Sequence, residues 1–192
     1  MVLRHANRWV MGAAAGILVL GVVLLFLPQS SIGPNARITG WVLLGAGALE
    51  LVAALARRRA AVRRIEFVLG AVTVGAALLI LLRPEAFALI WVAITCLLLR
   101  AVGAVVAGVL SAGAVRIWVL ARGLVDLALG GVLLAGAPLA AVVSIISGNR
   151  WPDRSGAVLT NFVAISILAT GISLLGLALR ARRQGLESPD DA

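Results

Sequence analysis

Four ionisable residues lie inside long apolar stretches of this chain, and their types and spacing could support chemistry. They are Glu50, Arg100, Arg122 and Asp126. A charge at mid-bilayer costs ~2.5–3.5 kcal/mol on insertion scales, so such side chains pair with one another or become hydrated. Two acids match two bases, which predicts a neutral buried charge network. A network of this kind either fixes helix packing or responds to protons, because buried carboxylates are common members of proton relays.

The spacing of these residues predicts that they meet. Arg122 and Asp126 are four residues apart, so they share one helix face. At ~1.5 Å per residue, Arg122 lies about two turns into its helix, at a depth similar to that of Glu50. Arg100 and Asp126 fall near the midplane. We therefore predict one network that joins Glu50, Arg122, Asp126 and Arg100.

The elements that must position these residues are six apolar stretches, each close to the ~20 residues that cross a hydrocarbon core. The stretches run over about 9–27, 38–56, 65–82, 87–110, 117–137 and 157–179. A bilayer has no water for backbone groups, so each must be a helix. The chain is 62% hydrophobic with a mean hydropathy of +1.10. We predict an all-α integral membrane protein, with one transmembrane domain over 1–183 and a polar tail over 184–192.

The distribution of arginine predicts the topology. All 17 basic residues are arginine, and with the N-terminus inside, the outer segments hold only Arg37, Arg83, Arg150 and Arg154. The positive-inside rule then places both termini in the cytoplasm. The densest inner cluster is Arg57, Arg58, Arg59, Arg63 and Arg64. It anchors the topology and offers contacts to anionic lipid heads. The expected partner is therefore the lipid bilayer, and no nucleic acid.

Three helical hairpins repeat along the chain. The first helix of each is predicted to end at a proline, namely Pro28, Pro84 or Pro138. In the second helices, nine residues separate Trp41 from Glu50, Trp91 from Arg100 and Phe162 from Gly171. Glu50, Arg100 and Gly171 thus occupy equivalent positions of a repeat. The last outer loop, about 139–156, is longer than the others and begins with an apolar run too short to span a membrane.

Catalytic, cofactor and metal sites are not expected. The sequence has no HExxH, GxSxG or P-loop motif. The single Cys96 and single His5 are too few for a metal cluster. We therefore expect a protein that is not an enzyme. Polar residues within the helices are expected to bond or pack between helices: Thr73, Thr95, Cys96, Asn161, Ser166 and Thr170.

Small residues recur along the helices, and Gly12 and Gly16 form a GxxxG pattern. Such patterns let helix backbones approach closely in lipid. Packing within one chain of six helices is favoured. A homo-oligomer, or a partner that is another membrane protein, stays open.

With these features the chain resembles the HdeD-like acid-resistance membrane proteins. The resemblance rests on the three hairpins and on odd helices of the form Gly12-x3-Gly16-x4-Gly21…Leu27-Pro28. It rests also on even helices of the form Trp41-Val-Leu-Leu-Gly-Ala-Gly-Ala-Leu-Glu50-Leu. It covers nearly the whole chain and implies a bacterial inner-membrane protein of acid or general stress tolerance, without catalytic residues to carry over. The segment 150–156 is longer than the family pattern.

The alternative is a small transporter or channel for protons or a small solute. Six helices around buried charges allow it, although few polar residues are available to line a path. The two interpretations differ in one structural feature. A continuous polar path through the bundle would favour transport, whereas isolated pairs in a tight core would favour a structural or sensing role.

Overall fold

The computed structural model describes residues 2–26, 32–55, 60–83, 86–111, 114–146 and 152–186. These ranges contain helices and no strand, which confirms the predicted all-α class. The helices are α1 (Val2–Phe26), α2 (Ile32–Leu55), α3 (Ala60–Leu82), α4 (Ala86–Leu110), α5 (Ala114–Ile146) and α6 (Pro152–Leu186). All 6 contain a span that is long and apolar enough to cross a membrane.

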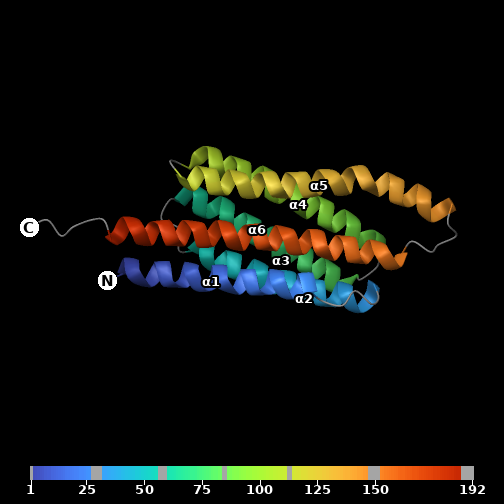
Figure 1. Cartoon of the computed structure of the whole chain (residues 1–192), viewed down its shortest axis with the longest axis horizontal. Coiled ribbons are helices and arrows are strands. Elements are labelled where there is room, and N and C mark those ends of the chain that lie inside the picture. Colours follow the sequence, from blue (N-terminus) through green and yellow to red (C-terminus); the bar gives the residue numbers. More distant parts are fainter. Residues whose placement is uncertain are drawn as a thin grey trace, which may run out of the picture.

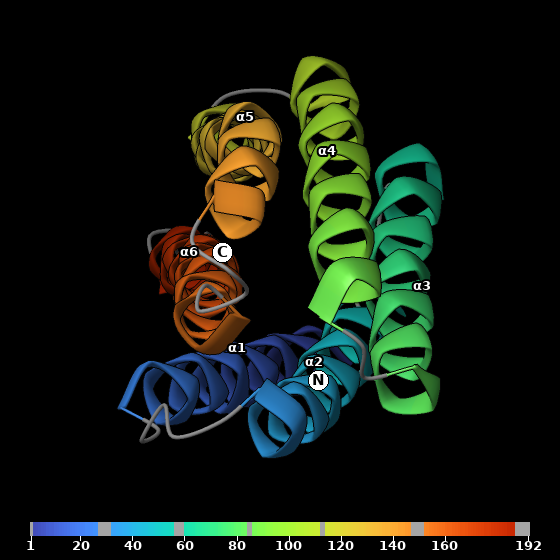
Figure 2. The ribbon, with the colours of Figure 1, turned by 90° about the vertical axis from the view of Figure 1, so that its right-hand side faces the viewer.

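The helices run side by side along the long axis of the molecule (Figure 1). Each helix contacts the next one along the chain, and α6 contacts α1, so the bundle forms a closed ring (Figure 2). The start of α1 and the end of α6 lie at the same end of the bundle (Figure 1). We call this the arginine end, because the exposed Arg63, Arg64, Arg116 and Arg180 lie there. The side of the membrane that it faces stays a prediction.

The closest helix pairs join different hairpins of the predicted repeat. They are α2 with α3, α4 with α5, and α6 with α1. Glycines allow these contacts, because a Cβ on Gly47 of α2 would lie 3.0 Å from the backbone N of Val74 on α3. A Cβ on Gly171 of α6 would lie 3.1 Å from the backbone N of Leu18 on α1. In lipid, such backbone contact replaces the hydrophobic drive that holds soluble bundles together.

The even-numbered helices lie deeper in the bundle than the odd-numbered ones. Buried residues make up 50%, 50% and 56% of the membrane spans of α2, α4 and α6. For α1, α3 and α5 the shares are 33%, 33% and 28%. The odd helices therefore present most of the surface available to lipid, while the even helices bring Glu50 and Arg100 to the centre.

Three predicted helix boundaries near the C-terminus are wrong. The fifth helix does not end before Pro138 but continues to Ile146, since a transmembrane helix tolerates the single lost backbone bond of a proline. The predicted loop over 139–156 is shorter accordingly, because α6 begins at Pro152. The α6 helix also continues to Leu186, into the predicted tail. By contrast, α1 and α3 end at Phe26 and Leu82, just before their prolines.

Candidate functional site

The guanidinium of Arg100 lies at the centre of a buried polar cluster. Its Nη1 is 2.9 Å from Oε1 and 3.0 Å from Oε2 of Glu50, and its Nε is 3.4 Å from Oδ2 of Asp126. Nη1 also donates to Thr73 Oγ1, and Nη2 donates to Thr170 Oγ1 at 2.7 Å. Arg100 on α4 thereby contacts α2, α3, α5 and α6.

Glu50 accepts hydrogen bonds from three residues on three neighbouring helices. Besides Arg100, it accepts a hydrogen bond from Thr73 Oγ1 at 3.2 Å and one from Arg122 Nη2 at 3.2 Å. The residue is only 6% exposed. A buried carboxylate is costly unless it is paired and hydrogen-bonded, and Glu50 meets both conditions.

Asp126 is fully enclosed, with 0% of its surface exposed. One carboxylate oxygen pairs with Arg100, and the other accepts a hydrogen bond from Ser166 Oγ on α6. Although Arg122 and Asp126 share a face of α5, they pair with different residues: Asp126 with Arg100, and Arg122 with Glu50. Arg100 thus connects two carboxylates that come from different helices.

Arg122 is the least satisfied member of the cluster. Its side chain is 9% exposed, and the 3.2 Å contact with Glu50 is its ion pair. Among the described residues, its Nε is the one buried side-chain nitrogen or oxygen without a hydrogen-bond partner. A buried N–H without an acceptor is rare in proteins and commonly marks a place for water.

The structure therefore brings together all four of the ionisable residues singled out in the sequence. We call Glu50, Arg100, Arg122 and Asp126 the charge network. Their formal charges cancel, so the low-dielectric core holds no net charge from them. Three hydroxyl groups donate to or accept from the charge network, those of Thr73, Ser166 and Thr170.

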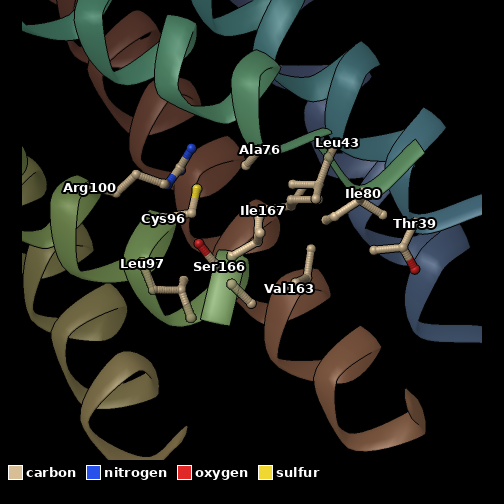
Figure 3. A pocket seen from close by; sticks show the side chains of 12 residues that line it. Thr39, Leu43, Ala76, Ile80, Cys96, Leu97, Arg100, Val163, Ser166 and Ile167 are labelled. Atoms are coloured by element: carbon tan, nitrogen blue, oxygen red, sulfur yellow. The ribbon is translucent and has the colours of Figure 1, made fainter. Parts of the chain in front are cut away.

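A small cavity adjoins the charge network at Arg100 and extends to Thr39 (Figure 3). Thr39 lies near the start of α2, so the cavity extends away from the arginine end. Its volume is about 30 Å³, enough for about one water molecule by volume. Arg100, Cys96 and Ser166 lie at one end and Thr39 at the other. The wall between them is apolar and includes Leu43, Ile80, Val92, Val163 and Ile167. A water there would have few polar partners, which favours a dry cavity.

Beyond the cavity, Thr39 of α2 and Thr160 of α6 approach each other, with 3.4 Å between their hydroxyl oxygens. Both residues are buried. They are separated from the charge network by the apolar part of the cavity. The other two buried serines, Ser111 and Ser173, bond to backbone oxygens. Within the described residues, the buried polar groups therefore form no continuous polar path.

The other residues singled out in the sequence lie in varied places. Arg63 and Arg64 are exposed at the start of α3, whereas 57–59 lie outside the described residues. Cys96 is a free, buried thiol in the cavity wall. Thr95 is exposed and Asn161 half-buried. Gly16 packs against Leu49 of α2, while nothing lies near Gly12, so the GxxxG pattern serves internal packing at one of its two glycines.

Sequence reasoning identified the hydroxyl groups as interhelical but did not assign them to the charge network. One signal was available for Thr170, which directly precedes Gly171, the residue equivalent to Glu50 and Arg100 in the predicted repeat. The positions of Thr73 and Ser166 depend on which helices become neighbours, and hydropathy does not determine that. Within the described residues, no group of His, Cys, Asp and Glu is placed to hold a metal ion.

Comparison with known protein families finds a match for one segment of this chain. A family model described as a short repeat of unknown function (DUF308) matches residues 12–82. The match covers less than half of the chain, from near the middle of α1 to the end of α3, and it includes Glu50 and Thr73 but not the other members of the cluster. No curated protein and no solved structure matches the chain. The matched repeat and the six apolar helices together indicate a multi-pass membrane protein.

Proposed function

We propose that this protein is an HdeD-like bacterial inner-membrane protein that contributes to acid or general stress tolerance and is not an enzyme. The matched repeat supports this, because it is the family domain of HdeD-like membrane proteins. In this proposal the arginine end faces the cytoplasm, both termini are cytoplasmic, and Arg57–Arg64 contacts anionic lipid heads.

The observation that carries the proposal is the central place of Arg100 between two buried carboxylates. Its pairs with Glu50 and Asp126, at 2.9 Å and 3.4 Å, join α4 to α2 and α5. Protonation of either carboxyl would remove a negative charge and leave part of the Arg100 charge unpaired in the core. An unpaired buried charge destabilises a structure by about 3–5 kcal/mol. The charge network would then hold the bundle together at neutral pH and loosen it in acid.

An acid-survival assay tests the proposed function. Cells without the gene would receive the wild type, Glu50→Gln, Asp126→Asn, or Ser173→Ala as a matched control outside the charge network. Wild type and the control should restore survival in acid, whereas the two carboxyl variants should not. Immunoblots of the membrane fraction must show equal protein levels. Full survival with both carboxyl variants would remove the proton-responsive role.

A small transporter or channel is the second candidate, favoured by the cavity that adjoins Arg100 and Ser166. The apolar stretch between this site and the Thr39–Thr160 pair argues against an open path. A pH-sensitive dye in proteoliposomes decides between the two candidates. A proton flux in the wild type that disappears in Asp126→Asn would establish transport, and no flux from folded protein would reject it.

A further inference from the structure

We propose that the charge network has an access route for water at Arg122, so that Glu50 and Asp126 exchange protons with the arginine end and not with the opposite end. This inference rests on the proposed proton-responsive role and adds to it the side of the membrane that is sensed. In this proposal the Nε of Arg122 binds a water molecule, while its Nη2 pairs with Glu50.

The first observation concerns the position of Arg122. It lies eight residues after the start of α5 at Ala114, or about 12 Å from the arginine end by helix rise. Its side chain is 9% exposed, which is the largest exposure in the charge network, against 6% for Glu50, 4% for Arg100 and 0% for Asp126. The guanidinium therefore bridges the buried Glu50 and the edge of the core.

The second observation is the Arg122 Nε–H, which is buried and has no acceptor among the described residues. Leaving such a donor unsatisfied costs about 1–3 kcal/mol or more for a charged group. A water molecule bound to Nε would remove that cost. Because the outward part of the side chain is not fully enclosed, this water would connect to bulk water at the arginine end.

On the side opposite to the arginine end, aliphatic side chains separate the charge network from water. Between Arg100 and the Thr39–Thr160 pair, the cavity wall is formed largely by aliphatic side chains, including Leu43, Ile80 and Ile167. Along α2, Thr39 and Glu50 are eleven residues apart, which corresponds to about 16 Å. Narrow apolar passages of this kind exclude water and act as barriers to ions.

The charged surroundings of the two carboxyls are consistent with access from one side. Glu50 faces Arg100 of α4 and Arg122 of α5, while Asp126 faces Arg100. Cys96 lies one turn from Arg100 on α4, and Glu66 of α3 is the next acidic group toward the arginine end. The spans Trp9–Phe26 of α1 and Thr160–Arg180 of α6 contribute no titratable residue except Arg180. The spans of α1 and α6 therefore contribute no carboxyl, imidazole or thiol group beside the cavity.

The test uses the full chain in proteoliposomes with one predominant orientation, and the probe dicyclohexylcarbodiimide. This apolar reagent reaches carboxyls from the lipid and adds covalently to their protonated form. The pH is set at 5 on one side and 7.5 on the other, and then reversed. Labelling of Glu50 and Asp126 is measured by mass spectrometry. In a separate aliquot, trypsin added outside the vesicles measures the fraction of protein whose arginine end faces outward, because that end is rich in cleavage sites.

We expect labelling to rise several-fold when the arginine end faces pH 5 and to stay low when the opposite end does. Labelling that follows the opposite end, or both ends equally, would overturn the access route while leaving the proton-responsive role in place. No labelling with pH 5 on both sides would reject both.

A matched pair of variants locates the barrier. Val163→Thr replaces a methyl group in the cavity wall by a hydroxyl group of similar size. This variant should make labelling sensitive to the pH at the opposite end as well. Val119→Thr makes the same change at a buried position outside the cavity wall and should leave the sidedness unchanged. Equal behaviour of the two variants would show that the cavity is not the barrier.

Discussion

Glu50 on α2 and Arg100 on α4 each lie nine residues after the Trp of a Trp–Val pair, yet they carry opposite charges and meet at 2.9 Å. The even helices lie innermost, so equivalent residues on them approach one another at the centre of the ring. Two identical charges at these positions would repel each other in a low-dielectric core. Because α2 carries an acid and α4 a base at this position, the two side chains can pair at the centre of the bundle.

The Glu50–Arg100 pair should contribute more to stability than the Glu50–Arg122 pair. Arg100 makes two contacts with the carboxylate, at 2.9 and 3.0 Å, whereas Arg122 makes one at 3.2 Å. Double-mutant cycles with Glu50→Gln, Arg100→Gln and Arg122→Gln measure both couplings by thermal unfolding in detergent. Couplings of contacting residues fall in the range of about 0.5–3 kcal/mol, and we expect the Arg100 value to be the larger. The reverse order would contradict the central role of Arg100.

Gly171→Ala should destabilise the protein, whereas Gly75→Ala should not. A Cβ at Gly171 would lie 2.7 Å from Leu18 Cγ and 3.1 Å from Leu18 N, so α1 would have to move. Overpacking of this kind costs about 1–3 kcal/mol. At Gly75 nothing lies within 4 Å of the added Cβ, and the gain in helix propensity is up to about 1 kcal/mol. Unfolding in detergent compares the two variants, and equal stabilities would show that α6 and α1 are not in backbone contact.

Ser166→Ala should be more harmful than Ser173→Ala, although both serines lie buried on α6. Ser166 donates to the enclosed carboxylate of Asp126, while Ser173 donates to the backbone oxygen of Trp118 at 3.3 Å. Hydrogen bonds to charged groups contribute about 1.5–3 kcal/mol, against about 0.5–1.5 kcal/mol for neutral ones. The same unfolding assay measures both losses. A larger loss for Ser173→Ala would show that Asp126 does not depend on Ser166.

Cys96 should report on the integrity of the charge network. It is the single cysteine of the chain, it is 8% exposed, and it lies one helical turn before Arg100. N-ethylmaleimide should therefore react slowly with the folded wild type and rapidly in sodium dodecyl sulfate. In Arg100→Gln the rate should rise by about tenfold for every ~1.4 kcal/mol lost from the opening free energy. An unchanged rate would mean that the thiol opens independently of Arg100.

Hydropathy and helix length were sufficient to predict the six helices, because a bilayer leaves the backbone no alternative to internal hydrogen bonds. The balance of two acids and two bases similarly predicted that the four charges would associate. The helical ends were harder to predict. Pro138 resembles Pro28 and Pro84 in sequence, yet α5 continues to Ile146, since the apolar residues after it extend the helix.

The identity of the neighbouring helices was not predictable from the sequence. Hairpins suggest that the two helices of one hairpin pack most closely, but the closest pairs join different hairpins: α2 with α3, α4 with α5, and α6 with α1. The choice depends on which glycine faces which backbone, as for Gly47 against Val74. The partners of Asp126 and Glu50 among the hydroxyl groups follow from that choice.

The contact between α6 and α1 has a consequence for biosynthesis. As the ribosome delivers the helices in order, the first helix must wait for the last, and until then Gly171 and Leu18 are not yet in contact. A nascent chain of five helices also lacks Ser166 for Asp126 and Thr170 for Arg100. Unfinished or truncated chains thus expose polar groups and small-residue faces to lipid. Membrane proteases and insertion factors would have a physical basis for distinguishing them from the finished protein.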